Sequence, residues 1–177
     1  MAGKQYSRDY RLIDSVDERG HIRTETEYIG SIYRFAAGFE TASAAQKRLR
    51  LLAWLAAGCF LLSLLPRSTA SLTLYVTLPY LFTALPLGLL LAALYRLRTL
   101  GERLDRRGAD QANDRVPACC FALMLLPGLS LLGEAAAVLR GGAFLPGDAL
   151  FLLGALGCAL CAWHCFRERE KLRAVSE

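Results

Sequence analysis

Four apolar blocks fill most of residues 51–166, and short polar breaks separate them. A helix needs about 20 predominantly apolar residues to cross the hydrocarbon core of a bilayer. The blocks therefore predict an all-α integral membrane protein with four transmembrane helices, arranged as two helical hairpins. We expect the spans at about residues 49–65, 72–94, 117–139 and 149–166.

Composition favours a membrane protein over a soluble domain. Of the 177 residues, 54% are hydrophobic, whereas roughly 45–50% is usual in soluble domains. We expect a polar cytosolic segment over residues 1–43, a membrane domain over 44–166 and a charged cytosolic tail over 167–177. The first apolar run begins far from the start, so no secretory signal peptide is expected.

The basic residues alternate along the chain in a way that predicts the topology. Lys and Arg number nine up to Arg50, at the start of the first expected span, then one in the first break, six in residues 95–115, one in the next break and four in the tail. Basic loops face the cytoplasm, so both termini and the 95–115 loop are expected on the cytoplasmic side of the plasma membrane. Basic residues that flank membrane helices account for the net charge of +5. A nucleic-acid partner is therefore not expected.

The basic loop, residues 95–115, is the longest polar interruption between the apolar blocks. Its leucines recur at helical spacing opposite its arginines, which predicts an amphipathic extension of the second helix along the membrane surface. Gly108 is expected to end this extension, and Asn113 or Asp114 to cap the third helix. The predicted membrane-surface basic residues are Arg48, Arg50, Arg96, Arg98, Arg103, Arg106 and Arg107.

Two short extended runs precede the membrane domain. Residues 10–16 and 21–28 read as strands around a turn at 17–20, where Asp first and Gly fourth suit a type I turn with a bulge. An isolated hairpin is marginal in water, so an ordered one should dock on the membrane domain or on a partner chain. The alternative is a flexible tail. The aromatic stretch 28–39 is expected to lie along the membrane interface.

Cysteines form a second candidate site. Five of the six lie in the third and fourth spans near their expected cytoplasmic ends, where a disulfide framework is not expected. A metal or thiol cluster would use Cys119, Cys120, Cys161, His164 and Cys165. The favoured alternative is close helix packing by the small residues Gly154, Cys158, Cys161 and Cys165. No standard ligand spacing completes a metal site, so no cofactor is expected.

Glu134 is the only acidic residue well inside an expected span. An ionisable residue at such a position is a functional candidate, here for solute transport. Arg140 follows six residues later, near the outer end of the same helix. The alternative is therefore a carboxylate that reaches water or pairs with Arg140.

No motif predicts an enzyme. The chain lacks a Walker A loop, a dinucleotide-binding glycine pattern and HExxH, and it holds two histidines. We expect an accessory or scaffolding subunit whose partner, besides the lipid bilayer, is a membrane protein or a second copy of the chain. The alternative is a small solute transporter or channel subunit using Glu134. A metal-binding or redox protein using the cysteines is a third reading.

Overall fold

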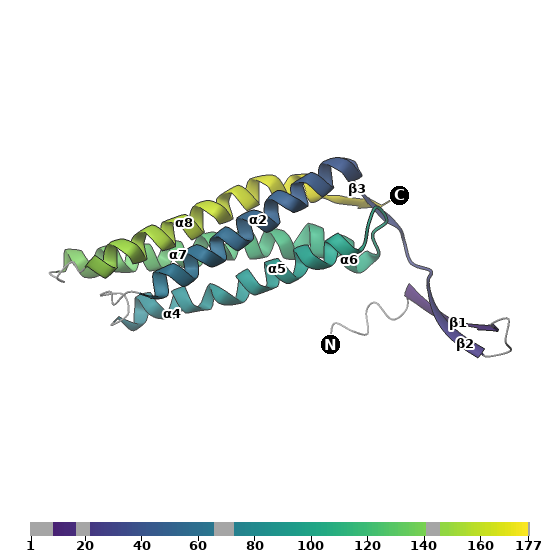
Figure 1. Ribbon diagram of the computed structural model, residues 1–177, viewed down its shortest axis with the longest axis horizontal. Coiled ribbons are helices and arrows are strands. Elements are labelled where there is room, and N and C mark those ends of the chain that lie inside the picture. Colours follow the sequence, from purple (N-terminus) through teal and green to yellow (C-terminus); the bar gives the residue numbers. More distant parts are fainter. Residues whose placement is uncertain (1–8, 17–21, 66–72, 141–145, 177) are drawn as a thin grey trace.

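The computed structural model describes residues 9–16, 22–65, 73–140 and 146–176. Most of this part of the chain is helical, and the long helices lie side by side in an elongated bundle (Figure 1). The prediction of a helical bundle is confirmed. The long helices are α2 (Phe39–Leu64), α4 (Leu74–Phe82), α5 (Ala84–Thr99), α7 (Val116–Leu139) and α8 (Pro146–Glu168).

Within the described residues, three helical segments are long and apolar enough to cross a membrane. They are Leu74–Thr99, Arg106–Leu139 and Pro146–Leu172. Helix α2 is not one of them, because Lys47, Arg48 and Arg50 lie within its first half.

The helices α2 and α8 pack closely through small residues. A Cβ added at Gly154 would lie 2.6 Å from the Cβ of Ser63 and 2.8 Å from the carbonyl oxygen of Cys59. A Cβ at Gly157 would lie 2.9 Å from the sulfur of Cys59. The two helix backbones can lie this close together only because α8 has glycine at these positions.

The second predicted span is divided into α4 and α5 at Thr83. Pro86 has no N–H to donate to the carbonyl of Phe82, and its ring clashes with that carbonyl in a regular helix. The Thr83 backbone N–H instead donates to the carbonyl of Tyr80 over 3.0 Å, and its hydroxyl donates to the carbonyl of Pro79 over 3.3 Å. The buried Thr83 therefore has partners for both its backbone N–H and its hydroxyl at the break.

Tyr80 occupies the centre of the bundle. Its ring lies between those of Phe60 and Phe151, at centroid distances of 5.1 and 4.9 Å. Its hydroxyl is hydrogen-bonded to the hydroxyl of Ser63, so the buried polar end has a partner. Tyr80 thereby connects α4 to both α2 and α8.

The third helix begins earlier than predicted. It starts with α6 (Arg106–Asp110), widens into the π-helix η2 (Gln111–Arg115) and continues as α7. Asp105 is the actual N-cap, since its carboxylate accepts the backbone N–H of Gly108 over 2.7 Å. The predicted helix end at Gly108 and the predicted caps Asn113 and Asp114 are therefore wrong.

The predicted amphipathic extension of the second helix is helical only as far as Thr99 and is wrong beyond that residue. Helix α5 ends at Thr99, and Gly101 then adopts a positive φ of 69°, a conformation that reverses the chain direction. Leu104 leaves the helical path and forms an antiparallel bridge with Tyr33, with N–H to carbonyl distances of 2.9 and 3.0 Å. The helical spacing of the leucines in residues 95–115 does not show that the chain turns at Gly101.

A small sheet joins distant parts of the chain at the same end of the bundle as the Leu104 bridge. Strand β3 (Tyr33–Phe35) pairs antiparallel with β4 (Ala174–Ser176), and Phe35 faces Ala174. The Tyr33 bridge adds the loop after α5 to this sheet. Neither strand was predicted, because three residues are too few to show a period of two.

The N-terminal hairpin forms as predicted. Strands β1 (Tyr10–Val16) and β2 (Ile22–Tyr28) pair antiparallel, with Tyr10 opposite Tyr28 and Val16 opposite Ile22. The predicted turn at 17–20 lies outside the described residues. Figure 1 shows the hairpin beyond the end of the bundle that carries β3, away from the long helices.

Candidate functional site

Basic residues gather at one end of the bundle, the end that carries β3 and β4. We call it the basic end. They come from the start of α2, the end of α5, the following loop, α6 and the chain after α8. This set includes every predicted membrane-surface residue: Arg48, Arg50, Arg96, Arg98, Arg103, Arg106 and Arg107. Among the described residues, Arg140 is the only Lys or Arg at the opposite end.

Arg106 connects the hairpin to the basic end. Its guanidinium lies 4.0 Å from the carboxylate of Asp9, and its backbone N–H donates to the Tyr28 hydroxyl over 2.9 Å. That hydroxyl donates in turn to the carbonyl of Ser31 over 2.9 Å. Burial raises the pKa of Tyr28, so its hydroxyl remains a donor at neutral pH. The ion pair is long and its Arg106 side chain is 44% exposed, so it contributes little, about 0–1 kcal/mol.

Asn113 holds the C-terminal strand against the third helix. Its side-chain amide donates to the carbonyl of Ala174 over 3.0 Å, and its side-chain oxygen accepts the Ala174 N–H over 2.9 Å. The amide thus pairs with one residue of β4 as a neighbouring strand would. Sequence reasoning assigned Asn113 to a helix cap, since nothing local shows that residue 174 lies beside it.

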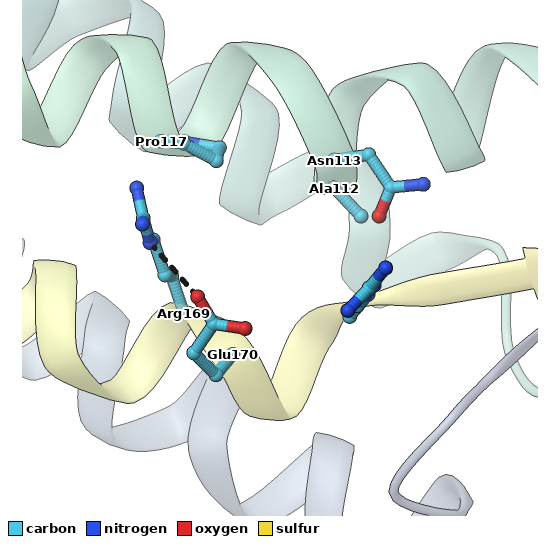
Figure 2. A pocket seen from close by; sticks show the side chains of 6 residues that line it. Ala112, Asn113, Pro117, Arg169 and Glu170 are labelled. Carbon is cyan, nitrogen blue, oxygen red and sulfur yellow. Dashed lines mark ion pairs between the residues drawn. The ribbon is translucent and has the colours of Figure 1, made fainter.

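A pocket of about 390 Å³ opens beside this contact (Figure 2). One wall is Ala112, Asn113 and Pro117, and the other is Arg169, Glu170 and Arg173. The guanidinium of Arg169 lies 3.5 Å from the Glu170 carboxylate and 3.5 Å above the Phe166 ring. The pocket is lined by two guanidinium groups and one carboxylate, which leaves a net positive charge. Such a pocket suits a ligand with a small acidic group. The sequence shows that Arg169 and Arg173 are basic, but it does not show that they line a pocket with the third helix.

The structure brings together only two of the predicted cluster residues. Cys120 of α7 and Cys165 of α8 are both buried, and the Cys165 thiol donates a weak hydrogen bond to the carbonyl of Leu49 over 4.0 Å. His164 is exposed on α8. All six cysteines are free thiols. Within the described ranges, which contain these cysteines and His164, no group of three or more His, Cys, Asp or Glu side chains could hold a metal ion.

The cysteines instead contribute to helix packing. Cys158 and Cys165 are fully or almost fully buried on α8, and Cys120 is fully buried on α7. Cysteine behaves as a small hydrophobic residue in such places. Cys161 is only partly buried, so the predicted small-residue face is narrower than the sequence implied.

Glu134 is fully buried, with 0% of its surface exposed. It follows Ser130 by one turn of α7, and the Ser130 hydroxyl donates to the Val76 carbonyl of α4 over 3.2 Å. Arg140 is exposed at the end of α7. The expectation that the Glu134 carboxylate reaches water is therefore wrong, because α4 packs over this face of the helix.

Comparison of the chain with protein-family models, curated proteins and solved structures finds no match. The case for a function therefore depends on the chain's own residues. Three features carry chemistry or contacts that the sequence motifs do not explain: the hairpin attached through Arg106, the arginine-lined pocket at the basic end, and the buried carboxylate of Glu134.

Proposed function

We propose that the protein crosses the plasma membrane four times, with the basic end and both termini in the cytoplasm. Exposed large apolar side chains cover the outside of the bundle, as expected for contact with lipid. Helix α2 shares this character: its exposed residues include Leu51, Trp54, Leu55, Leu61 and Leu62. The placement of Lys and Arg at one end agrees with the positive-inside rule.

The small sheet supports α2 as the fourth span. Because β3 pairs with β4, the chain enters α2 at the end of the bundle where α8 finishes. Helix α2 then packs along α8, so the two run antiparallel. If α8 crosses the bilayer, its neighbour α2 crosses it too. The apolar stretch 51–64 is about 21 Å long at 1.5 Å per residue, and Arg48 and Arg50 can extend to the headgroups.

Within this membrane arrangement, the protein acts as an accessory or scaffolding subunit. The observation that carries this proposal is the hairpin, which stands beyond the bundle at the basic end. The outer edges of β1 and β2 have no neighbouring strand among those described. Such edges pair readily with a strand of another chain. We place the docking site for a membrane-protein partner on this hairpin.

The test replaces residues 10–28 with a Gly/Ser linker of equal length and asks what co-purifies from native membranes in mild detergent. The variant should lose a partner that the wild type retains, while its helical circular dichroism stays unchanged apart from the missing strands. Arg98→Gln, an exposed change at the same end, serves as the matched control. A partner that remains on the linker variant would contradict docking through the hairpin.

A small solute transporter is the second candidate, and the burial of Glu134 favours it. A carboxylate inside a span is costly and commonly marks a solute or ion path. Isolated protein in liposomes would then move a solute and lose this on Glu134→Gln, but not on Glu102→Gln, an exposed change at the basic end. Such flux from the isolated chain would contradict the accessory role.

A further inference from the structure

A groove of about 640 Å³ lies between α2 and α5, below the basic end. Arg50 and Trp54 line it from α2, one turn apart. From α5 it is lined by Leu91, Ala92, Tyr95 and Arg96 among others. The remaining surface of the groove is mainly apolar, and both Trp54 and Tyr95 are 66% exposed.

The groove has a polar end and an apolar end. Helix α2 runs away from the basic end, so Arg50 lies nearer to that end than Trp54. Helix α5 runs toward it, so Arg96 lies nearer to it than Ala92. Each arginine stands one turn, about 6 Å, above the apolar residues of its own helix. Both positive charges therefore lie on the cytoplasmic side, with the apolar surface deeper in the proposed bilayer.

The arginines retain capacity for a ligand. The Nε of Arg50 is buried and finds no hydrogen-bond partner among the described residues. A buried donor without an acceptor is costly. Arg96 approaches Asp105 at 3.9 Å, a long ion pair made by a single nitrogen, Nη2. A phosphate in the groove would accept charge-assisted hydrogen bonds from both guanidinium groups.

We propose that this groove binds one anionic phospholipid of the cytoplasmic leaflet. Its phosphate lies between Arg50 and Arg96, and an acyl chain follows Leu91 and Ala92 beside the Trp54 ring. Basic sites between transmembrane helices on the cytoplasmic side favour such lipids. A zwitterionic headgroup is disfavoured because its ammonium would face the same two arginines. The inference rests on the membrane orientation proposed above.

The experiment measures quenching of Trp54 by brominated lipids. Trp163→Phe leaves Trp54 as the only tryptophan, since the chain has two. The protein is reconstituted in phosphatidylcholine vesicles with equal mole fractions of either brominated phosphatidylglycerol or brominated phosphatidylcholine. The anionic lipid should quench Trp54 several-fold more efficiently, because the two arginines concentrate it in the groove.

Two double variants locate the selectivity. Arg50→Gln with Arg96→Gln should abolish the preference for the brominated anionic lipid. Arg98→Gln with Arg107→Gln removes the same charge from exposed positions at the same end and should preserve it. Loss of the preference in both double variants would assign it to general surface charge and overturn the site.

The remaining outcomes separate this inference from the membrane proposal. Equal quenching by the two brominated lipids overturns the anionic lipid site and leaves the membrane orientation standing. Absence of quenching by either lipid contradicts the lipid exposure of Trp54, and with it the proposed membrane span of α2.

Discussion

Gly154 decides how closely α2 and α8 approach. Its missing side chain leaves room for the Cβ of Ser63 and the carbonyl of Cys59, both of which a Cβ would meet at under 3.0 Å. One of these neighbours is backbone and cannot rotate away. The contact between the two helices therefore depends on the absence of a side chain at Gly154, as it does to a lesser degree at Gly157.

We expect Gly154→Ala to destabilise the bundle by about 1–3 kcal/mol, because the added methyl overpacks the contact. Gly128→Ala is the matched control, since a Cβ there meets nothing within 4 Å. It should stabilise the helix by up to about 1 kcal/mol through higher helix propensity. Unfolding in mixed detergent and SDS micelles measures both changes. A Gly154→Ala variant that is as stable as the wild type, or more stable, would contradict the close packing of α2 and α8.

At the scale of elements, the chain after α8 is held by contacts that are distant in sequence. Strand β4 pairs with β3, and Asn113 bonds both the N–H and the carbonyl of Ala174. A backbone hydrogen bond from Ala36 to the carbonyl of Arg173, 2.8 Å long, adds to them. The segment that precedes α2 and the π-helix η2 are thereby joined through the C-terminal strand.

Asn113→Ala should weaken this junction without unfolding the helices. Two hydrogen bonds at about 1 kcal/mol each predict roughly 10- to 30-fold faster local opening. Hydrogen exchange of the C-terminal peptide containing Ala174 reports it. Asp114→Ala, an exposed neighbouring change, is the control and should leave the exchange unaltered. Unchanged exchange in the Asn113 variant would mean that β3 alone holds the strand.

The sequence did not predict the short strands β3 and β4 or the correct cap of the third helix. The residues 10–16 and 22–28 are long enough to show an extended pattern, and they form the predicted hairpin. Strands β3 and β4 have three residues each, too few for a pattern. From the sequence, the predicted helix cap is Asn113 or Asp114. Asp105 caps the helix because the chain turns at Gly101, and that turn accompanies the pairing of Leu104 with Tyr33.

For the whole molecule, the separation of charge between the two ends predicts a fixed orientation. A thiol introduced by Arg140→Cys should react with a membrane-impermeant maleimide on intact cells, because Arg140 is exposed at the outer end. A thiol from Glu102→Cys, exposed at the basic end, should react only after permeabilisation. Labelling is read above that of the wild type, whose cysteines are buried or half-buried. The reverse pattern would contradict cytoplasmic termini.

The sequence by itself determined the long helices, the N-terminal hairpin and the collection of basic residues between apolar blocks. Each of these depends on neighbouring residues, through periodicity, turn chemistry or local charge. Only the tertiary structure decided the burial of Glu134, the burial of Cys120 and Cys165 and the role of Asn113. These depend on which side chains from distant segments meet when the helices pack, and no local pattern specifies that.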